Sequence, residues 1–110
     1  MERVDSGLEF DSLVVKSPIP VMVEFVDPLC EFCDFIEPAM NQLAQEFEGK
    51  CKFYKLDISL NREIAAKCGV LGYVPYFMMF KGGFTGMRIR GPATYEELRK
   101  LVTTYVKLSS

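Results

Sequence analysis

The sequence predicts an α/β fold in which a central mixed β-sheet is covered by helices on both faces. Segments with apolar side chains at helical spacing alternate with short, nearly continuous apolar runs, as expected for helices that alternate with buried strands. Gly82 and Gly83 separate the last two apolar runs and predict an antiparallel hairpin, which makes the sheet mixed. A chain of 110 residues can bury its own core, so we expect residues 1–110 to form a single domain.

The first half of the chain is expected to alternate between helix and strand. Residues 8–16 carry apolar side chains at helical spacing and predict a helix. Residues 19–26 form the kind of continuous apolar run that is covered on both faces of a sheet. A longer helix is predicted over residues 32–47, with Pro38 inside it, and a second buried strand over residues 51–58.

The second half is expected to contain a short helix over residues 61–68, a hairpin and a last helix. The two strands of the hairpin are predicted over residues 76–81 and 85–90, on either side of the glycines. The last helix begins after Thr94, because Thr94 and Glu97 have the spacing of a capping box.

Composition and charge exclude several classes of protein. The net charge of −2 gives no reason to expect nucleic-acid binding. No apolar run reaches the ~18 residues of a membrane span, so no membrane association is expected. Residues 1–5 are polar and acidic, unlike a signal peptide, and we therefore expect a cytoplasmic protein. In that compartment a close pair of cysteines indicates catalysis or metal binding rather than a structural disulfide.

Cys30 and Cys33 form such a close pair at the predicted start of the longer helix. Two cysteines at this spacing lie within reach of one another, so they can form a disulfide or open to a dithiol. The amide groups at a helix start carry partial positive charge, which favours a thiolate on the first cysteine. The pair therefore predicts a redox-active site.

A zinc site is the competing interpretation of the same pair. Structural zinc needs four ligands, usually with a second close pair of Cys or His. The chain has no histidine, and the remaining cysteines, Cys51 and Cys68, stand singly in apolar surroundings. We expect these two to be buried, inert thiols, and we expect no metal.

The ordered set of motifs resembles the thioredoxin family. The stretches that carry the resemblance are residues 21–25, residues 28–33 with both cysteines, Pro38, residues 54–57, Gly69-Val70, Val74-Pro75, residues 80–83, and Gly91. They cover roughly residues 8 to 106 in family order, and such an ordered set is far more specific than a lone cysteine pair. The resemblance implies a thioredoxin fold.

The resemblance also implies roles for the site residues. Cys30 would attack a substrate disulfide, and Cys33 would resolve the mixed disulfide that results. Pro75 takes the position of the family's cis proline, and the backbone of Val74 would pair with the substrate chain. Gly91 belongs to the same implied substrate-binding surface. The alternative for Pro75 is a trans proline that merely starts an edge strand.

Glu24 is a carboxylate inside an otherwise apolar central strand, and it matches the family's buried acid. Its implied role is proton exchange with Cys33 during resolution. Lys55, on the adjoining strand, matches the family lysine that pairs with that acid. The alternative is an outward-facing pair of Glu24 and Lys55 at a strand edge, worth less than ~1 kcal/mol.

Several residues depart from the family pattern. Leu29 replaces the usual Trp, Glu31 and Phe32 replace the usual Gly-Pro, and Asp34 replaces a basic residue, while Tyr73 is an extra residue before the proline. Leu29, Phe32, Tyr73 and Tyr76 are expected either to form an apolar contact patch for a protein substrate or to be partly buried core. Acidic side chains near Cys30 oppose a thiolate, which argues for a reductant over an oxidant, although the helix start acts in the opposite direction.

The sequence thus predicts a cytoplasmic thiol-disulfide oxidoreductase, specifically a thioredoxin-like protein-disulfide reductase without a bound cofactor. Its expected partners are protein disulfide substrates and a partner disulfide reductase that donates electrons, and we expect a monomer. Two alternatives remain open. One is a disulfide isomerase or oxidase of the same fold, and the other is a non-catalytic interaction module whose cysteine pair is incidental.

Overall fold

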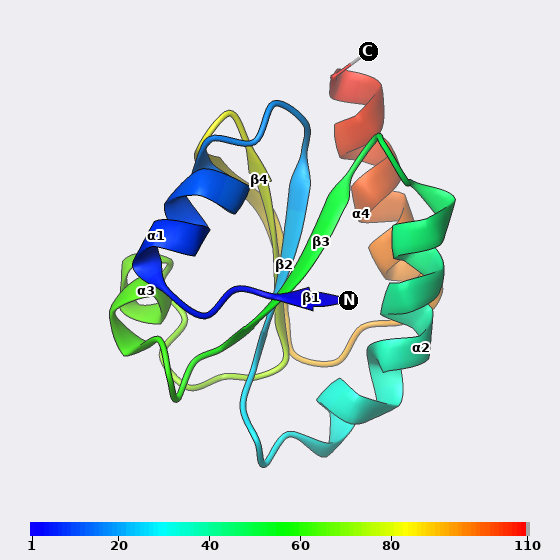
Figure 1. Ribbon diagram of the computed structural model, residues 1–110. Coiled ribbons are helices and arrows are strands. Elements are labelled where there is room, and N and C mark those ends of the chain that lie inside the picture. The colour runs from blue at the N-terminus through cyan, green and yellow to red at the C-terminus, as the bar shows by residue number, and fades with distance from the viewer. Residues whose placement is uncertain (110) are drawn as a thin grey trace.

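In the computed structural model, which describes residues 1–109, a five-stranded sheet has helices on both faces (Figure 1). The strands are β1 (Glu2–Arg3), β2 (Val21–Val26), β3 (Lys52–Asp57), β4 (Tyr76–Lys81) and β5 (Phe84–Arg90). The helices are α1 (Gly7–Phe10), which continues as the π-helical turn η1 (Asp11–Val15), α2 (Glu31–Glu46), α3 (Arg62–Lys67) and α4 (Tyr95–Leu108). The predicted α/β class with a mixed sheet is confirmed.

Each helix and strand predicted from the sequence is present, with shifts of a few residues at the ends. The predicted first helix is divided into α1 and η1, and Pro38 lies inside a continuous α2. Strand β1, which no pattern in the sequence predicts, pairs in parallel with β3 through Glu2 opposite Tyr54. A two-residue exposed strand of charged side chains has no apolar alternation that could have revealed it.

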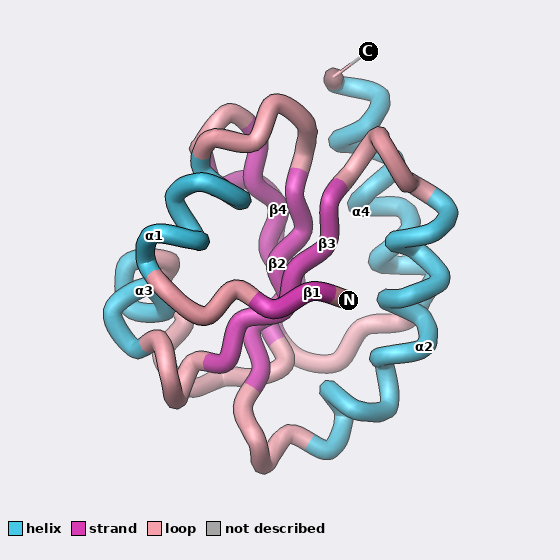
Figure 2. The backbone as a smooth tube through the Cα atoms, viewed as in Figure 1, coloured by secondary structure: helices cyan, strands magenta, loops and turns pink. Residues whose placement is uncertain are grey.

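The strand order β1-β3-β2-β4-β5 places β2 at the centre of the sheet. It runs parallel to β3 and antiparallel to β4, and β4 and β5 form the predicted hairpin. The carboxyl ends of β2 and β3 therefore lie at the same edge of the sheet as the amino end of β4 (Figure 2). The loop after β2 and the Val74–Pro75 segment before β4 meet at this edge.

Two cores lie on opposite sides of the sheet. Helices α1 and α3 cover one face, and α2 and α4 cover the other (Figure 1). Successive side chains of a strand point to opposite faces, so Met22 packs in the core of α2 and α4 while Val23 packs in the core of α1 and α3. The same alternation directs Glu24 toward the layer that contains α2.

A capping box at the start of α4 and a contact between α4 and α2 stabilise the helical layer on that face of the sheet. Thr94 accepts a hydrogen bond from the Glu97 backbone at 3.1 Å, and the Glu97 carboxylate accepts one from the Thr94 backbone at 3.0 Å, which confirms the predicted capping box. Arg99 of α4 donates to Glu46 of α2 at 2.6 Å. Among residues 1–109, no helix has the length and apolar character needed to cross a membrane.

Candidate redox site

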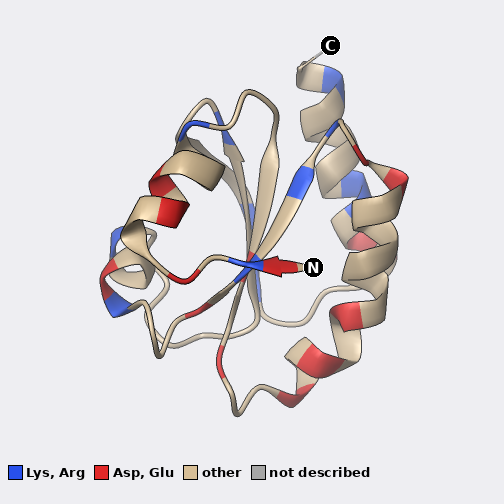
Figure 3. Cartoon of the chain, in the orientation of Figure 1, with Lys and Arg blue, Asp and Glu red and all other residues tan. Residues whose placement is uncertain are grey.

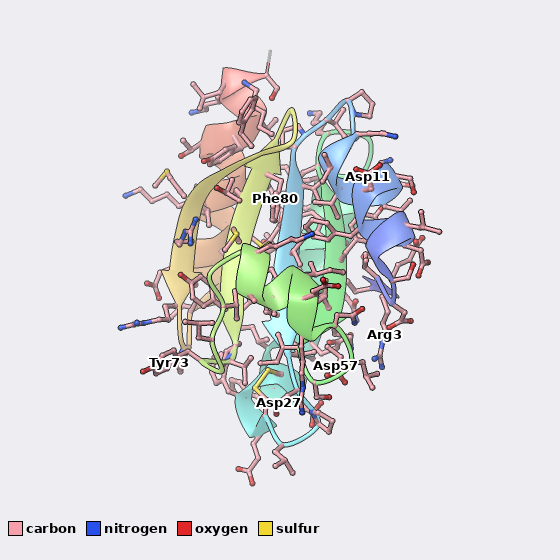
Figure 4. The ribbon with its side chains drawn as sticks, turned by 90° about the vertical axis from the view of Figure 1, so that its left-hand side faces the viewer. Arg3, Asp11, Asp27, Asp57, Tyr73 and Phe80 are labelled. Atoms are coloured by element: carbon pink, nitrogen blue, oxygen red, sulfur yellow. A yellow bond between two sulfur atoms is a disulfide. The ribbon has the colours of Figure 1, made fainter. Side chains whose placement is uncertain are left out.

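Cys30 and Cys33 form a disulfide at the start of α2, with an S–S distance of 2.04 Å. Figure 4 shows this disulfide at the end of the molecule that also carries Asp27, Asp57 and Tyr73, far from Phe80. That end is the sheet edge where β2 and β3 finish and β4 begins. The predicted pairing of the two cysteines is confirmed.

A tight turn after β2 presents Cys30 to the helix. The carboxylate of Asp27 accepts a hydrogen bond from the Leu29 backbone at 2.8 Å, and the Asp27 carbonyl accepts one from the Cys30 backbone at 3.2 Å. Cys30 is the N-cap of α2, and its Sγ accepts a hydrogen bond from the Cys33 backbone N–H at 3.1 Å. A helix-start amide thus points at this sulfur, where it would stabilise a thiolate once the disulfide is reduced.

The two sulfur-bearing residues differ in how far solvent reaches them. Cys30 is partly exposed, whereas Cys33 is only 5% exposed and belongs to the buried face of α2. An incoming disulfide can therefore reach Cys30, while Cys33 lies inside and can act on what Cys30 has bound. This asymmetry agrees with the order of roles that the sequence implies.

Pro75 and Gly91 lie side by side at the same edge of the sheet. The Val74–Pro75 peptide bond is cis, as the sequence analysis expected. The Gly91 backbone N–H donates to the Pro75 carbonyl at 2.8 Å, and Gly91 has a φ of +93°, a conformation that side chains other than glycine's disfavour. Tyr73, 60% exposed, has the Arg90 guanidinium 4.8 Å from its ring centre.

The apolar residues around the disulfide are mostly on the surface. Leu29 is 90% exposed, and Phe32 is partly buried with its ring centre 5.7 Å from that of Phe35. Phe32 also lines an apolar groove of about 480 Å³ between α2 and the Pro92–Ala93 segment next to Gly91. The contact-patch interpretation therefore fits Leu29 and Tyr73, and Phe32 takes part in both patch and core. Tyr76 is buried and belongs to the core on the other face of the sheet.

Glu24 is fully buried, with an exposed fraction of 0%, and neither of its carboxylate oxygens has a hydrogen-bond partner. The alternative of an outward-facing side chain is wrong. Burial is the main cause that raises the pKa of Glu24 from 4.5 to about 8; the charges of Glu37 and Asp34 raise it further, and Lys55 lowers it. The acid is thus set to gain or lose a proton near neutral pH.

Lys55 lies directly opposite Glu24 in the register of β2 and β3, yet its ion pair is with a different acid. Its ammonium donates to both carboxylate oxygens of Glu37 on α2, at 3.2 and 3.1 Å. The expected pairing of Lys55 with Glu24 is therefore corrected. The signal for Glu37 was available, because Glu37 follows Cys33 by one helical turn and shares its face of α2.

Carboxylates crowd the beginning of α2, as Figure 3 shows along its first turns. Glu31 and Asp34 are exposed, and Glu37 is half-buried against Lys55. Beside them a polar cleft of about 190 Å³ is lined by Cys33, Asp34 and Lys55, together with Arg3, Val26, Asp27, Pro28 and Asp57. Cys33, although buried, therefore borders a polar cleft beside these carboxylates.

The other two cysteines are free and buried, as predicted. Burial raises the pKa of the Cys51 thiol to about 12 and also raises that of Cys68. Such thiols are poor nucleophiles at neutral pH. Within residues 1–109, no group of three or more His, Cys, Asp or Glu side chains is arranged to hold a metal ion.

Comparison with known proteins agrees with this site. The family model described as Thioredoxin matches residues 3–104. Thioredoxin M4, chloroplastic, of Arabidopsis thaliana is 37% identical over 101 residues, which are 92% of this chain and 52% of that protein. The thioredoxin of Haemophilus influenzae is 37% identical over 75 residues, which are 68% of this chain and 69% of that protein. The chain spans about half the length of the first chloroplast relatives that it matches.

The fold agrees as well. A solved mutant thioredoxin from Halobacterium salinarum NRC-1 superposes with a TM-score of 0.86 and 25% identity, over 96% of this chain and 89% of that one. This similarity confirms the predicted fold.

Proposed function

The chain belongs to the thioredoxin family, and from that premise we propose that it is a protein-disulfide reductase. The observation that carries the proposal is the asymmetric pair at the start of α2. Cys30 is partly exposed and receives a backbone N–H, while Cys33 is buried one turn further on. A nucleophile that solvent reaches and a shielded resolving thiol are what a two-step disulfide exchange needs.

The reaction begins with the dithiol form. The Cys30 thiolate attacks one sulfur of a substrate disulfide, forms a mixed disulfide and releases the other substrate sulfur as a thiolate. Cys33 then loses its proton and attacks the Cys30 sulfur, so that the second substrate thiolate leaves and the Cys30–Cys33 disulfide forms. Two electrons pass to the substrate, and a partner disulfide reductase returns two electrons to the pair. No bound cofactor takes part.

Glu24 and Lys55 take part in the transfer of the proton that Cys33 gains and loses. Glu24 lies in the buried layer that faces α2, where burial raises the pKa of its carboxyl group to about 8. Cys33 and Lys55 both line the polar cleft, which admits water beside them. We assign Glu24 the exchange of this proton and Lys55 a modulating charge.

The substrate chain would lie across the exposed residues beside the disulfide. Leu29 and Tyr73 offer apolar surface, Glu31 and Phe32 separate the cysteines, and the backbone of Val74 stands before Pro75 at the same sheet edge. Gly91, bonded to the Pro75 carbonyl, borders this surface. A substrate of this kind would be a protein with an accessible disulfide.

A coupled assay tests the proposal. Supplied with a small dithiol as electron donor, the parent protein should reduce an exposed disulfide in a test protein. Cys30→Ser should abolish turnover, and Cys33→Ser should accumulate a mixed disulfide at Cys30. Cys51→Ser and Cys68→Ser are the matched controls and should remain active. An active Cys30→Ser variant would contradict the assignment of Cys30 as the nucleophile.

The reduction potential of the cysteine pair distinguishes a reductase from an oxidase or isomerase. The reduction potential of the Cys30–Cys33 pair should lie near that of a reductant; a value in the range of strong oxidants would favour an oxidase or isomerase. No transfer of electrons to any protein disulfide would favour an interaction module. Gel filtration tests the proposed monomer.

We propose a cytoplasmic location. Free Cys51 and Cys68 suit a reducing compartment, and a cytoplasmic protein would meet that condition. Three of the first relatives carry chloroplast names, so a fractionation experiment should compare the cytoplasm with organelles.

A further inference from the structure

Lys55 stands between two acids and is bound to only one of them. It is paired in register with Glu24 on β2, but its ammonium donates to both oxygens of Glu37, at 3.2 and 3.1 Å. Both oxygens of Glu24 lack a hydrogen-bond partner, and its side chain is fully buried. A buried carboxylate without donors is costly as an anion, and a nearby ammonium lowers that cost, so the position of Lys55 affects how readily Glu24 ionises.

The charged groups around Glu24 divide into two acids that oppose its ionisation and one cation that favours it. Helix α2 contributes Glu37 and Asp34, and both oppose a negative charge on Glu24. Strand β3 contributes Lys55, and β4 places the uncharged Phe77 opposite Glu24. Arg3 of β1, next to Lys55 in the sheet, is paired with Asp57 at 3.7 Å and Asp5 at 3.5 Å. Lys55 is thus the cation that ionised Glu24 would depend on, and Glu37 holds it.

We propose that Glu37 is a positioning residue for the proton step at Cys33, because it binds the Lys55 ammonium, which therefore does not pair with the buried carboxyl group of Glu24. This inference rests on the proposed function for its role at Cys33. Glu37 itself touches neither substrate nor sulfur in the reaction. It acts on Glu24, both by the direct repulsion of its own charge and by holding the Lys55 ammonium.

The protonated acid suits the step in which the disulfide is opened. When a donor thiolate attacks the Cys30 sulfur, the S–S bond breaks and Cys33 leaves as a thiolate. Glu24 then donates its proton to the Cys33 sulfur and becomes a carboxylate, and a proton from solvent restores the acid. In the opposite direction, Glu24 must first be ionised to accept the proton of Cys33, so resolution should accelerate as pH rises toward about 8.

The test measures the titration of Glu24 directly, by carbon-13 NMR of its carboxyl group in the oxidised protein. The signal is assigned by its loss in Glu24→Gln. Glu37→Gln should lower the Glu24 titration midpoint by about one pH unit, because an opposing charge is removed and the ammonium is freed. The pH profile of mixed-disulfide resolution should move in the same direction. An unchanged midpoint in a folded Glu37→Gln variant would overturn the proposal.

Three further variants sharpen the result. Glu37→Asp keeps the charge and should restore a midpoint near the parental one. Lys55→Gln should raise the midpoint, because the stabilising cation is lost. Glu46→Gln also removes an ion-paired glutamate of α2, bound to Arg99 at 2.6 Å, and should leave the Glu24 midpoint unchanged. If Glu46→Gln lowers it equally, the effect is a general loss of charge and the proposal fails.

The two proposals fail in different ways. A parent protein without reductase activity, in which Glu37→Gln still moves the Glu24 titration, would remove the proposed function and with it the role at Cys33. An active parent in which Glu37→Gln moves neither the titration nor the pH profile would remove only the role of Glu37.

Discussion

The backbone N–H of Cys33 donates a hydrogen bond to the Sγ of Cys30 across 3.1 Å. This contact aims the positive end of α2 at the sulfur that solvent can reach. The carboxylates of Glu31 and Asp34 in the same first turn oppose it. The stability of the Cys30 thiolate therefore depends on a balance between the helix start, which favours it, and the two carboxylates, which oppose it.

That balance can be shifted by changing the two exposed acids together. Glu31→Gln combined with Asp34→Lys should lower the Cys30 thiol pKa by about one unit, because unfavourable charges are removed and a favourable one is added. More thiolate stabilises the reduced form, so the variant should also be more oxidising than the parent. Thiolate absorbance against pH and equilibration in a thiol redox buffer measure the two effects. A thiol pKa that stays constant or rises would show that these acids only cap the helix.

Glu24 should make stability depend on pH in a definite direction. Its pKa is raised from 4.5 to about 8 in the folded protein, so between these values the unfolded chain releases a proton that the folded protein retains. Stability from this group is complete below pH 4.5 and is lost as pH rises through about 8. The free energy of unfolding should fall by on the order of 5 kcal/mol over that window.

Urea unfolding at a series of pH values checks this expectation. Glu24→Gln cannot ionise and should lose most of the downward slope, so that it gains on the parent as pH rises. Glu48→Gln changes an exposed acid and should keep the parental slope. Parallel curves for the parent and Glu24→Gln would mean that Glu24 ionises freely in the folded protein.

The exposed apolar residues beside the disulfide should contribute to the reduction of protein disulfides and not to the reduction of small disulfides. Leu29→Ala and Tyr73→Ala should each lower kcat/KM for a protein disulfide about five-fold, as expected for an interface contact worth ~1 kcal/mol. Leu8→Ala removes an equally exposed leucine, 86% accessible on α1, and should have no effect. The rate with a small aromatic disulfide should be unchanged in all of them; if it falls equally, the substitutions act on the cysteines and not on a contact surface.

Gly86 is required by its approach to Tyr105. The Tyr105 hydroxyl accepts a hydrogen bond from the Met87 backbone at 2.6 Å, and a Cβ on Gly86 would lie 1.7 Å from that hydroxyl oxygen. Gly86→Ala should therefore lower the free energy of unfolding by about 1–3 kcal/mol through overpacking. Gly7→Ala, with nothing within 4 Å of the added Cβ, should change it by less than ~0.5 kcal/mol. Equal effects of the two substitutions in chemical denaturation would contradict this account.

The sequence alone determined the order of the main elements, the redox pair and the unusual acid. The spacing of Cys30 and Cys33 at a predicted helix start identifies the redox pair. The spacing of Thr94 and Glu97 identifies the capping box at the start of the last helix. Glu24 stands out because the strand around it is apolar. These signals are local, because the spacing or periodicity of side chains within one helix or strand can be read directly from the sequence.

The tertiary structure alone decided which partners these residues have. Lys55 can reach an acid on β2 or one on α2, and the packing of α2 against the sheet gives it Glu37. The contact of Gly86 with Tyr105, on β5 and α4, is equally invisible in the chain, as is the pairing of β1. Long side chains and short polar strands carry no periodic signal, so their partners depend on distances and desolvation that exist only once the layers are assembled.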